Sequence, residues 1–226
     1  MIATRRFTSN VSNQFRALIT GAPGSGKGTI SSRIATDFDL VHISSGDVLR
    51  RHVKQGTELG HKAKAYIDNG TLVPDDLMVN LMTNEIKRIS KTRWLLDGFP
   101  RTIEQAKQLH KKQKFDVVVN LDVPFSEIKR RIQQRYVHLS SGRVYHLEWN
   151  PPKNAGMDDV TGEPLTQRDD DKPETVASRL NIFQSQMAPV LAFYKDLGIL
   201  QTFTGTESDV IYPEIKAYLL GYLQSK

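Results

Sequence analysis

Five short apolar runs divide the chain, and segments with helical periodicity separate them. The runs are 16–20, 40–44, 93–96, 117–123 and 200–203. Each is apolar nearly throughout, which is typical of strands that are buried on both faces. This alternation predicts a doubly wound α/β fold around a parallel five-stranded sheet. In such folds, ligands bind beyond the carboxyl ends of the strands.

The segments between the runs carry signals that start and stop helices. Gly56 and Gly70 end two short helical patterns, and Pro74 followed by two acids begins another;. The predicted helices cover 26–38, 45–56, 57–70, 74–90, 124–136, 174–198 and 210–223.

Residues 136–171 do not continue the alternation. The segment is rich in Gly, Pro, Asp and Thr, and a turn signal at Ser141-Gly142 precedes the strand-like run 143–149. A stretch of this length without a helix is usually functional or disordered, and Tyr145 and Trp149 argue against disorder. We therefore expect a small inserted β subdomain that acts as a lid.

Composition places the chain among globular proteins. Its 226 residues are 38% hydrophobic and 25% charged, with a net charge of +6 and no cysteine. No apolar run approaches the ~18–20 residues that span a bilayer. The absence of cysteine excludes disulfides and thiolate zinc sites. The basic balance favours an anionic partner, which can be nucleic acid, a membrane or a phosphorylated small molecule.

A polar leader, predicted to span 1–15, precedes the first strand. Residues 1–20 contain three arginines and several Ser, Thr and Asn but no acid. This composition fits an organelle import signal and fits a disordered leader equally well. It does not fit a secretory signal, because no apolar segment follows the arginines.

A glycine-rich loop follows the first apolar run. The segment from Gly21 to Lys27 matches the phosphate-binding pattern GxxxxGK, but Gly28 replaces the usual hydroxyl residue, and Thr29 follows one position late;. Backbone N–H groups of such a loop bind phosphate, and Lys27 adds a mobile cation. Without a hydroxyl at 28, Mg²⁺ would depend on phosphate oxygens, water and a carboxylate elsewhere. Asp97, after the third apolar run, is placed for this role.

The segment 97–102 forms a second cluster at the end of a predicted strand. Gly98 permits close approach of the backbone, Pro100 fixes the turn, and Arg101 projects from it. A helix cap and a surface charge are the ordinary interpretations of Asp97 and Arg101 taken singly. At a strand end beside a phosphate loop, the pair favours a binding site.

Arginines gather at both ends of the predicted lid. The full set is Arg50, Arg101, Arg131, Arg135, Arg168 and Arg179. Arg131 and Arg135 are four apart and should share one face of the predicted helix 124–136, whereas Arg168 and Arg179 flank the other end. A solvated basic face is the default for any single arginine. Together their planar guanidinium groups suit phosphoryl oxygens, and phosphoryl transfer needs positioned cations rather than a nucleophile.

Four polar residues in the insert repeat the spacing of a zinc ribbon. His138 and Ser141 are three apart, as are Asp158 and Thr161;. Ser and Thr are poor zinc ligands. We therefore predict a hydrogen-bonded group that holds the lid without metal.

The motifs resemble those of the adenylate kinases of the long-lid type. They occur in order over about residues 16–220 as GAPGSGKGT, SSGDVLR, GTLVPDD, LLDGFPRT, SSGRVYH, NPPKNAGMDDVTGEPLTQRDDD and KPETVASRL. The resemblance implies a P-loop NTPase-type core at 16–44, 74–134 and 172–226. It also implies a helical AMP-binding insert at 45–73 and a β lid without zinc at 135–171.

The resemblance also implies a role for each matching residue. Catalytic positions are matched by Lys27, Arg101, Arg135, Arg168 and Arg179. Donor-nucleotide contacts are matched by Gly24, Ser25, Gly26, Lys27, Gly28, Thr29, Arg131, Tyr145 and Glu207. AMP contacts are matched by Ser45, Arg50, Ile67, Thr71, Val73, Gly98, Arg101, Gln105, Arg168 and Arg179.

Further matches concern the metal and the charges around it. Asp97 matches the residue that holds Mg²⁺ through water, and Asp170 and Asp171 match acids that orient the arginines. The positions where other members place four zinc cysteines are occupied here by His138, Ser141, Asp158 and Thr161.

The implied activity is reversible, Mg²⁺-dependent phosphoryl transfer from a nucleoside triphosphate to AMP. Within the family, the chain is most similar to members that use GTP in the mitochondrial matrix. We therefore expect GTP as the donor, location in the matrix and an import role for the leader. An ATP-preferring adenylate kinase is the alternative, since the guanine-reading motif NKxD is absent. We expect a monomer without nucleic-acid or membrane partners.

A P-loop switch or a nucleic-acid-binding module is the alternative from another class. A switch needs a loop hydroxyl on Mg²⁺ and a sensor of the γ-phosphate, and the sequence shows neither. Nucleic-acid binding would interleave basic residues with stacking aromatics. The arginines gather instead at the hinges of the lid.

Overall fold

The structure is a computed structural model that describes residues 14–89 and 92–226. The predicted leader 1–15 therefore lies outside the described residues except for its last two positions, and Phe15 already belongs to the first strand. Within the described part of the chain, no helix is both long and apolar enough to cross a membrane.

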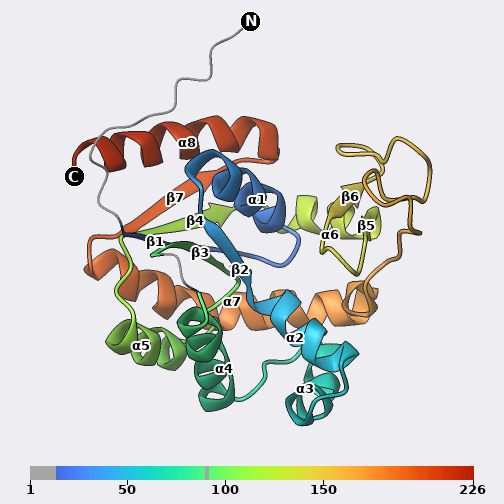
Figure 1. The fold of residues 1–226 in the computed structure, drawn as a ribbon, viewed down its shortest axis with the longest axis horizontal. Helices are drawn as coiled ribbons and strands as arrows, with labels where there is room; N and C mark the ends of the chain where they lie inside the picture. Colours follow the sequence, from blue (N-terminus) through green and yellow to red (C-terminus); the bar gives the residue numbers. More distant parts are fainter. Residues whose placement is uncertain (1–13, 90–91) are drawn as a thin grey trace, which may run out of the picture.

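A parallel five-stranded sheet forms the centre of the fold (Figure 1). Its strands are β1 (Phe15–Gly21), β2 (Val41–Ser44), β3 (Arg93–Asp97), β4 (Val117–Asp122) and β7 (Leu200–Thr204). Their order is β2-β3-β1-β4-β7, and every neighbouring pair is parallel. The predicted doubly wound five-stranded sheet is confirmed.

Helices cover both faces of this sheet (Figure 1). One face carries α1 (Lys27–Phe38) and α8 (Ser208–Gln224), and the other carries α4 (Asp75–Lys87), α5 (Ile103–Lys112) and α7 (Pro173–Asp196). Within β1, Ala17 and Ile19 pack into the first layer and Leu18 into the second. Successive side chains of a strand point to opposite faces, so burial on both sides explains the continuous apolar runs.

Two inserts project from the carboxyl edge of the sheet (Figure 1). The first contains α2 (Ser45–Lys54) and α3 (Glu58–Asp68). Gly56 and Gly70 follow these helices with φ of 60° and 65°, a conformation that favours glycine and ends a helix;. The second contains the antiparallel pair β5 (Arg135–Val137) and β6 (Val144–His146), and the 3₁₀ turn η1 (Asp169–Asp171) leads back to α7.

The predicted helix 124–136 is too long. Helix α6 covers only Phe125–Gln133, and Arg135 begins β5, where it pairs with His146 of β6. The prediction that Arg131 and Arg135 share a helix face is therefore wrong. The polar sequence around Arg135 favours a helix, but hydrogen bonding of residues 135–137 to β6 makes this segment a strand.

Helix α5 was not predicted. Its start carries a clear signal, because the Thr102 hydroxyl accepts a hydrogen bond from the Gln105 N–H at 3.1 Å. A Thr followed by acidic and long side chains is a common helix N-terminus. Gln105 lies in the first turn of this helix.

Candidate active site

A cleft of about 790 Å³ opens at the carboxyl edge of the sheet. Its walls come from the loop after β1, the ends of β2 and β3, both inserts, and α6, α7 and α8. This is the position at which parallel α/β sheets bind ligands.

The loop between β1 and α1 encloses the amine of Lys27. Its Nζ donates hydrogen bonds to the carbonyls of Gly21 and Ala22 at 2.6 and 2.7 Å. At Gly24 the backbone φ is +81°, and a Cβ atom there would lie only 2.7 Å from Ile132. Both the conformation and the close packing therefore favour glycine at this position.

The start of α1 offers N–H donors. Among the residues that the structure describes, no side chain caps this helix, and a Cβ atom at Gly28 would have no neighbouring atom within 4 Å. The buried Ser25 hydroxyl has no hydrogen-bond partner among the described residues. Uncapped N–H groups at an open helix start form a ready site for an anion.

The charge of Lys27 depends on its surroundings. Burial lowers the pKa of Lys27 to about 7, Asp97 opposes this shift, and Arg101 adds to it. A pKa this close to neutrality would leave a substantial fraction of the amine uncharged near pH 8 before an anion binds. A polyphosphate beside the amine would raise its pKa again.

We expect donor-nucleotide binding to take up protons through Lys27. At pH 7.5–8.5 the wild type should take up a substantial fraction of a proton on binding a nucleoside triphosphate. Titration calorimetry in buffers with different ionisation enthalpies measures this uptake. The variant Lys27→Met should lose it, and equal uptake by wild type and variant would contradict the assignment.

Two acids fix arginines at the base of the insert that contains β5 and β6, which we expect to act as a lid. Arg135 Nε donates to Asp171 Oδ2 at 2.9 Å, and its Nη2 pairs with the other oxygen of the same carboxylate. Arg179 Nη1 lies 2.7 Å from Asp170 Oδ2. Such pairs hold planar guanidinium groups in one orientation.

The arginines at the base of this insert keep a surplus of positive charge. Burial, together with the charges of Arg50 and Arg135, lowers the pKa of Arg168 to about 9. Burial lowers the pKa of Arg179 to about 10 although Asp170 opposes the shift. The buried Nε of Arg168 has no hydrogen-bond partner within 14–89 and 92–226. A bound polyanion would relieve this repulsion and supply the missing acceptor.

Asp97 lies beneath the loop at the end of β3. Its Oδ2 accepts a hydrogen bond from the Ser31 hydroxyl at 3.2 Å and lies 3.2 Å from His42 Nε2. Among the described residues, no group of three or more His, Cys, Asp or Glu side chains could hold a metal ion by itself. A cation here would complete its coordination with water and phosphate oxygens.

A smaller pocket adjoins the cleft beside the helical insert. Predicted AMP contacts that line it are Arg50, Ile67, Thr71, Val73, Arg101, Gln105 and Arg179. The other three, Ser45, Gly98 and Arg168, line the larger cleft. Ser45 Oγ and Arg101 Nε donate to the same Gly98 carbonyl at 2.9 and 2.7 Å. Burial lowers the pKa of the Arg101 guanidinium.

The larger cleft gathers the predicted donor contacts. Those that line it are Gly24, Gly26, Lys27, Gly28, Thr29, Arg131, Tyr145 and Glu207. Ser25 is the exception, because its side chain is buried beneath the loop. All five predicted catalytic residues also line this cleft.

An aromatic pair that the sequence analysis missed lies beside Arg131. His146 and Trp149 stack with ring centroids 4.0 Å apart at 21°, and the Arg131 guanidinium lies 5.2 Å from the centre of the Trp149 ring. Both aromatic residues line the cleft. Such a surface can stack a base. Arg131 and Trp149 are eighteen residues apart, on opposite sides of the β5–β6 pair, so no short motif in the sequence signalled it.

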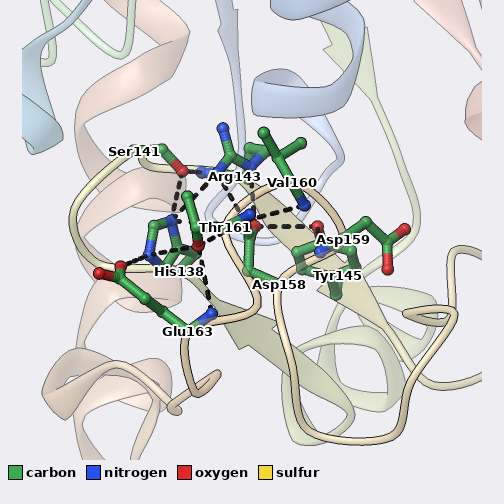
Figure 2. Close-up of polar contacts among 9 residues, drawn as sticks. All are labelled: His138, Ser141, Arg143, Tyr145, Asp158, Asp159, Val160, Thr161 and Glu163. Carbon is green, nitrogen blue, oxygen red and sulfur yellow. Dashed lines mark hydrogen bonds and ion pairs between the residues drawn. The ribbon is translucent and has the colours of Figure 1, made fainter.

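The four polar residues with zinc-ribbon spacing hydrogen-bond to one another in the lid (Figure 2). His138 Nδ1 lies 2.7 Å from the Ser141 hydroxyl, and the Thr161 hydroxyl donates to Asp158 at 2.9 Å. The same hydroxyl lies 3.5 Å from His138 Nε2 and so links the two pairs.

Three further side chains complete this lid network (Figure 2). Arg143 donates to both carboxylate oxygens of Asp158 at 2.7 and 2.6 Å, and the Tyr145 hydroxyl donates at 2.9 Å. Glu163 pairs with His138 Nε2. The hydrogen bonds from Arg143 first, and then those from Thr161 and Tyr145, hold the pKa of Asp158 well below its usual range.

We expect Asp158→Asn to lower Tm by about 5 °C or more at pH 7, because an amide would turn its N–H group toward donors. Thermal unfolding followed by circular dichroism measures this. The carboxylate stabilises the fold above its unfolded-state pKa of about 4, and this contribution disappears as pH falls through the lower folded-state pKa. The gap between wild type and variant should therefore shrink in acid. Asp159→Asn, at an exposed neighbour, is the control, and equal Tm values for Asp158→Asn and wild type would contradict the account.

Together, the loop, the sheet order and the two inserts define a P-loop nucleotide-binding protein. A family model described as adenylate kinase matches residues 19–199. The GTP:AMP phosphotransferase, mitochondrial, of Drosophila melanogaster is 48% identical over 205 residues, which cover 91% of this chain and 95% of that protein. A Saccharomyces cerevisiae protein with the same name is 44% identical over 225 residues, which cover 95% of this chain and 96% of that protein. The chain belongs to the adenylate kinase family.

Proposed function

We propose that the protein is a nucleoside monophosphate kinase that transfers the γ-phosphoryl group of GTP reversibly to AMP, giving GDP and ADP. One observation carries this proposal. The side chains of Arg101 and Arg179 line both the donor cleft and the smaller pocket. Phosphates that enter from the two sides would therefore meet at the same guanidinium groups.

The geometry suits transfer between two bound nucleotides. Lys27 and the arginines supply fixed positive charge where negative charge builds up on the transferring group. Because attack comes from an oxygen of the acceptor phosphate, no covalent intermediate on the protein is required. The lid and the helical insert flank this region and would exclude water when nucleotides bind.

Mg²⁺ is the cofactor that this chemistry uses, and Asp97 is the residue that we propose holds it through water. The open position at Gly28 and the lack of a hydroxyl at that position fit this indirect arrangement. When bound, the ion would neutralise charge on the triphosphate oxygens. Ser31 and His42, which both approach Asp97 Oδ2, would fix the carboxylate.

The choice of GTP over ATP, the location and the assembly state are finer proposals. The relatives named above carry GTP and a mitochondrial location in their names, which supports both for this chain. We propose the mitochondrial matrix and a monomer that binds neither nucleic acid nor membrane. Family membership favours the kinase over the P-loop switch and the nucleic-acid-binding module.

A coupled assay tests the nucleotide preferences. GTP, ITP and ATP are offered as donors to AMP, and GMP and CMP are then offered as acceptors for GTP. We expect transfer from GTP and ITP to AMP to be much faster than transfer from ATP. Equal rates with ATP and GTP would contradict the proposed preference for GTP. The absence of any transfer to AMP would overturn the kinase proposal.

A further inference from the structure

The side-chain amide of Gln105 is held between two partners of opposite character. Its Oε1 accepts from the backbone N–H of Arg101 at 2.7 Å, and its Nε2 donates to Asp75 Oδ1 at 2.8 Å. A backbone N–H can only donate, and an ionised carboxylate can only accept. Turning the amide over would place donor against donor and acceptor against acceptor, which is costly because Gln105 is only 2% exposed;.

Asp75 is itself fixed in place. Its second carboxylate oxygen accepts from the Thr102 hydroxyl at 3.0 Å, and that hydroxyl also caps α5 by accepting from the Gln105 N–H. Asp75 is the first residue of α4, so it joins the start of one helix to the start of another. It lines neither the cleft nor the smaller pocket, whereas Gln105 lines the pocket.

The amide of Gln105 has hydrogen-bonding capacity left for a ligand. Its oxygen has a second lone pair and its nitrogen a second hydrogen, and the same pocket contains the apolar side chains of Leu49, Ile67, Val73 and Phe99;. Apolar walls with one polar group that fixes orientation are typical of a site for a nucleobase.

The fixed orientation matches one purine and opposes another. Along its Watson–Crick edge, adenine presents an amino donor beside a ring-nitrogen acceptor. Hypoxanthine presents the reverse, a carbonyl acceptor beside an N–H donor. The amide of Gln105 offers an acceptor and a donor side by side. For a base held in one orientation by its phosphate and the pocket walls, an amide that cannot turn over pairs fully with only one of these two purines, and with AMP as the acceptor that purine is adenine.

We propose that Asp75 is a positioning residue that sets the base specificity of the acceptor site by fixing the amide of Gln105. This inference rests on the proposed function, in which AMP is the acceptor. Asp75 lines neither cavity and would reach the acceptor base through Gln105, so it should affect which base binds rather than the phosphoryl transfer itself.

The test compares Asp75→Asn with Asp76→Asn. Asp76 is the matched control because it is the next residue in the same helical turn and also accepts from a glutamine amide, that of Gln108 at 3.1 Å. Kinetics are measured with GTP as donor and with AMP or IMP as acceptor. An Asn at 75 can accept or donate, so only the backbone N–H of Arg101 still favours one orientation of the Gln105 amide;.

For Asp75→Asn, the ratio of kcat/KM for AMP to that for IMP should fall about tenfold, the effect of one unfavourable hydrogen-bond contact. The change should appear in KM, and kcat with saturating AMP should stay within about twofold of wild type. Asp76→Asn should keep the wild-type ratio. An unchanged ratio in Asp75→Asn, or an equal fall in both variants, would overturn the inference.

Two further measurements keep the test decisive. Asp75→Ser, which suits a helix start and can also donate or accept, should show the same shift if the Asn variant folds poorly. Equilibrium dissociation constants for AMP and IMP give the ratio independently of turnover. If wild type transfers phosphate to AMP but the Asp75 variants keep its ratio, only this inference fails. If wild type does not use AMP, the proposed function fails and this inference with it.

Discussion

Lys27→Met should reduce kcat for GTP and AMP by about 10³-fold while the protein remains folded. The Lys27 amine is bound to the carbonyls of Gly21 and Ala22 and lies beside the uncapped start of α1, where the donor phosphates should bind. Methionine keeps the length of the side chain but loses the cation. The loss should appear mainly in kcat, because the charge matters most when the γ-phosphoryl group is in transit.

Steady-state kinetics with both nucleotides near saturation measure this effect. Lys62→Met is the control, because it removes a lysine from an exposed ion pair with Glu58 on α3, away from the phosphate loop. The control should keep wild-type turnover. If the turnover of Lys27→Met stayed within tenfold of wild type, Lys27 would not be a catalytic residue.

Arg101→Ala should lower kcat/KM for AMP by about 10²- to 10³-fold. Arg101 lines both cavities, and its Nε is fixed by the Gly98 carbonyl. The guanidinium would therefore contact the acceptor phosphate and the group in transit. Because its burial already lowers its pKa, removing it should leave the fold intact and should relieve some repulsion between cations.

Thermal unfolding and kinetics together test this prediction. Tm of Arg101→Ala should equal or slightly exceed that of wild type, while activity collapses. Arg88→Ala, which removes an exposed arginine paired with Glu85, should keep activity. Near-wild-type turnover by Arg101→Ala would refute its placement, and a large fall in Tm would show that its role is mainly structural.

The sheet could be predicted because burial on both faces leaves a strong local signal. Every residue of the run 117–119 is buried, and the same holds for 17–19. The phosphate loop and Asp97 follow directly from these strands, because both come immediately after an apolar run. Strand ends of a parallel sheet share one edge, so short motifs there predict a common site.

The lid was harder to predict because its structure depends on contacts between distant residues. The polar sequence that includes Gln133 and Arg135 has a helical pattern, but its last part forms strand β5 because it pairs with β6. Spacing alone suggested His138, Ser141, Asp158 and Thr161 as a group. The donors Arg143 and Tyr145 could not be predicted, because their role follows from the complete burial of the Asp158 side chain.

Part of the acceptor site was also beyond the sequence analysis. Gln105 was expected there from family resemblance, but the sequence does not show which way its amide points. That orientation is set by the backbone N–H of Arg101 together with Asp75, which lies thirty residues earlier and on a different helix. Hydrogen-bond partners that are distant in sequence become visible only when α4 and α5 are placed side by side.

We propose direct transfer of a phosphoryl group between two nucleotides. The most direct test supplies AMP and GTP labelled with ³²P in the γ position, with Mg²⁺, and follows the label by chromatography. We predict that label appears in the β-phosphate of ADP in one-to-one proportion with GDP. Label released as inorganic phosphate without labelled ADP would show hydrolysis and would contradict the account.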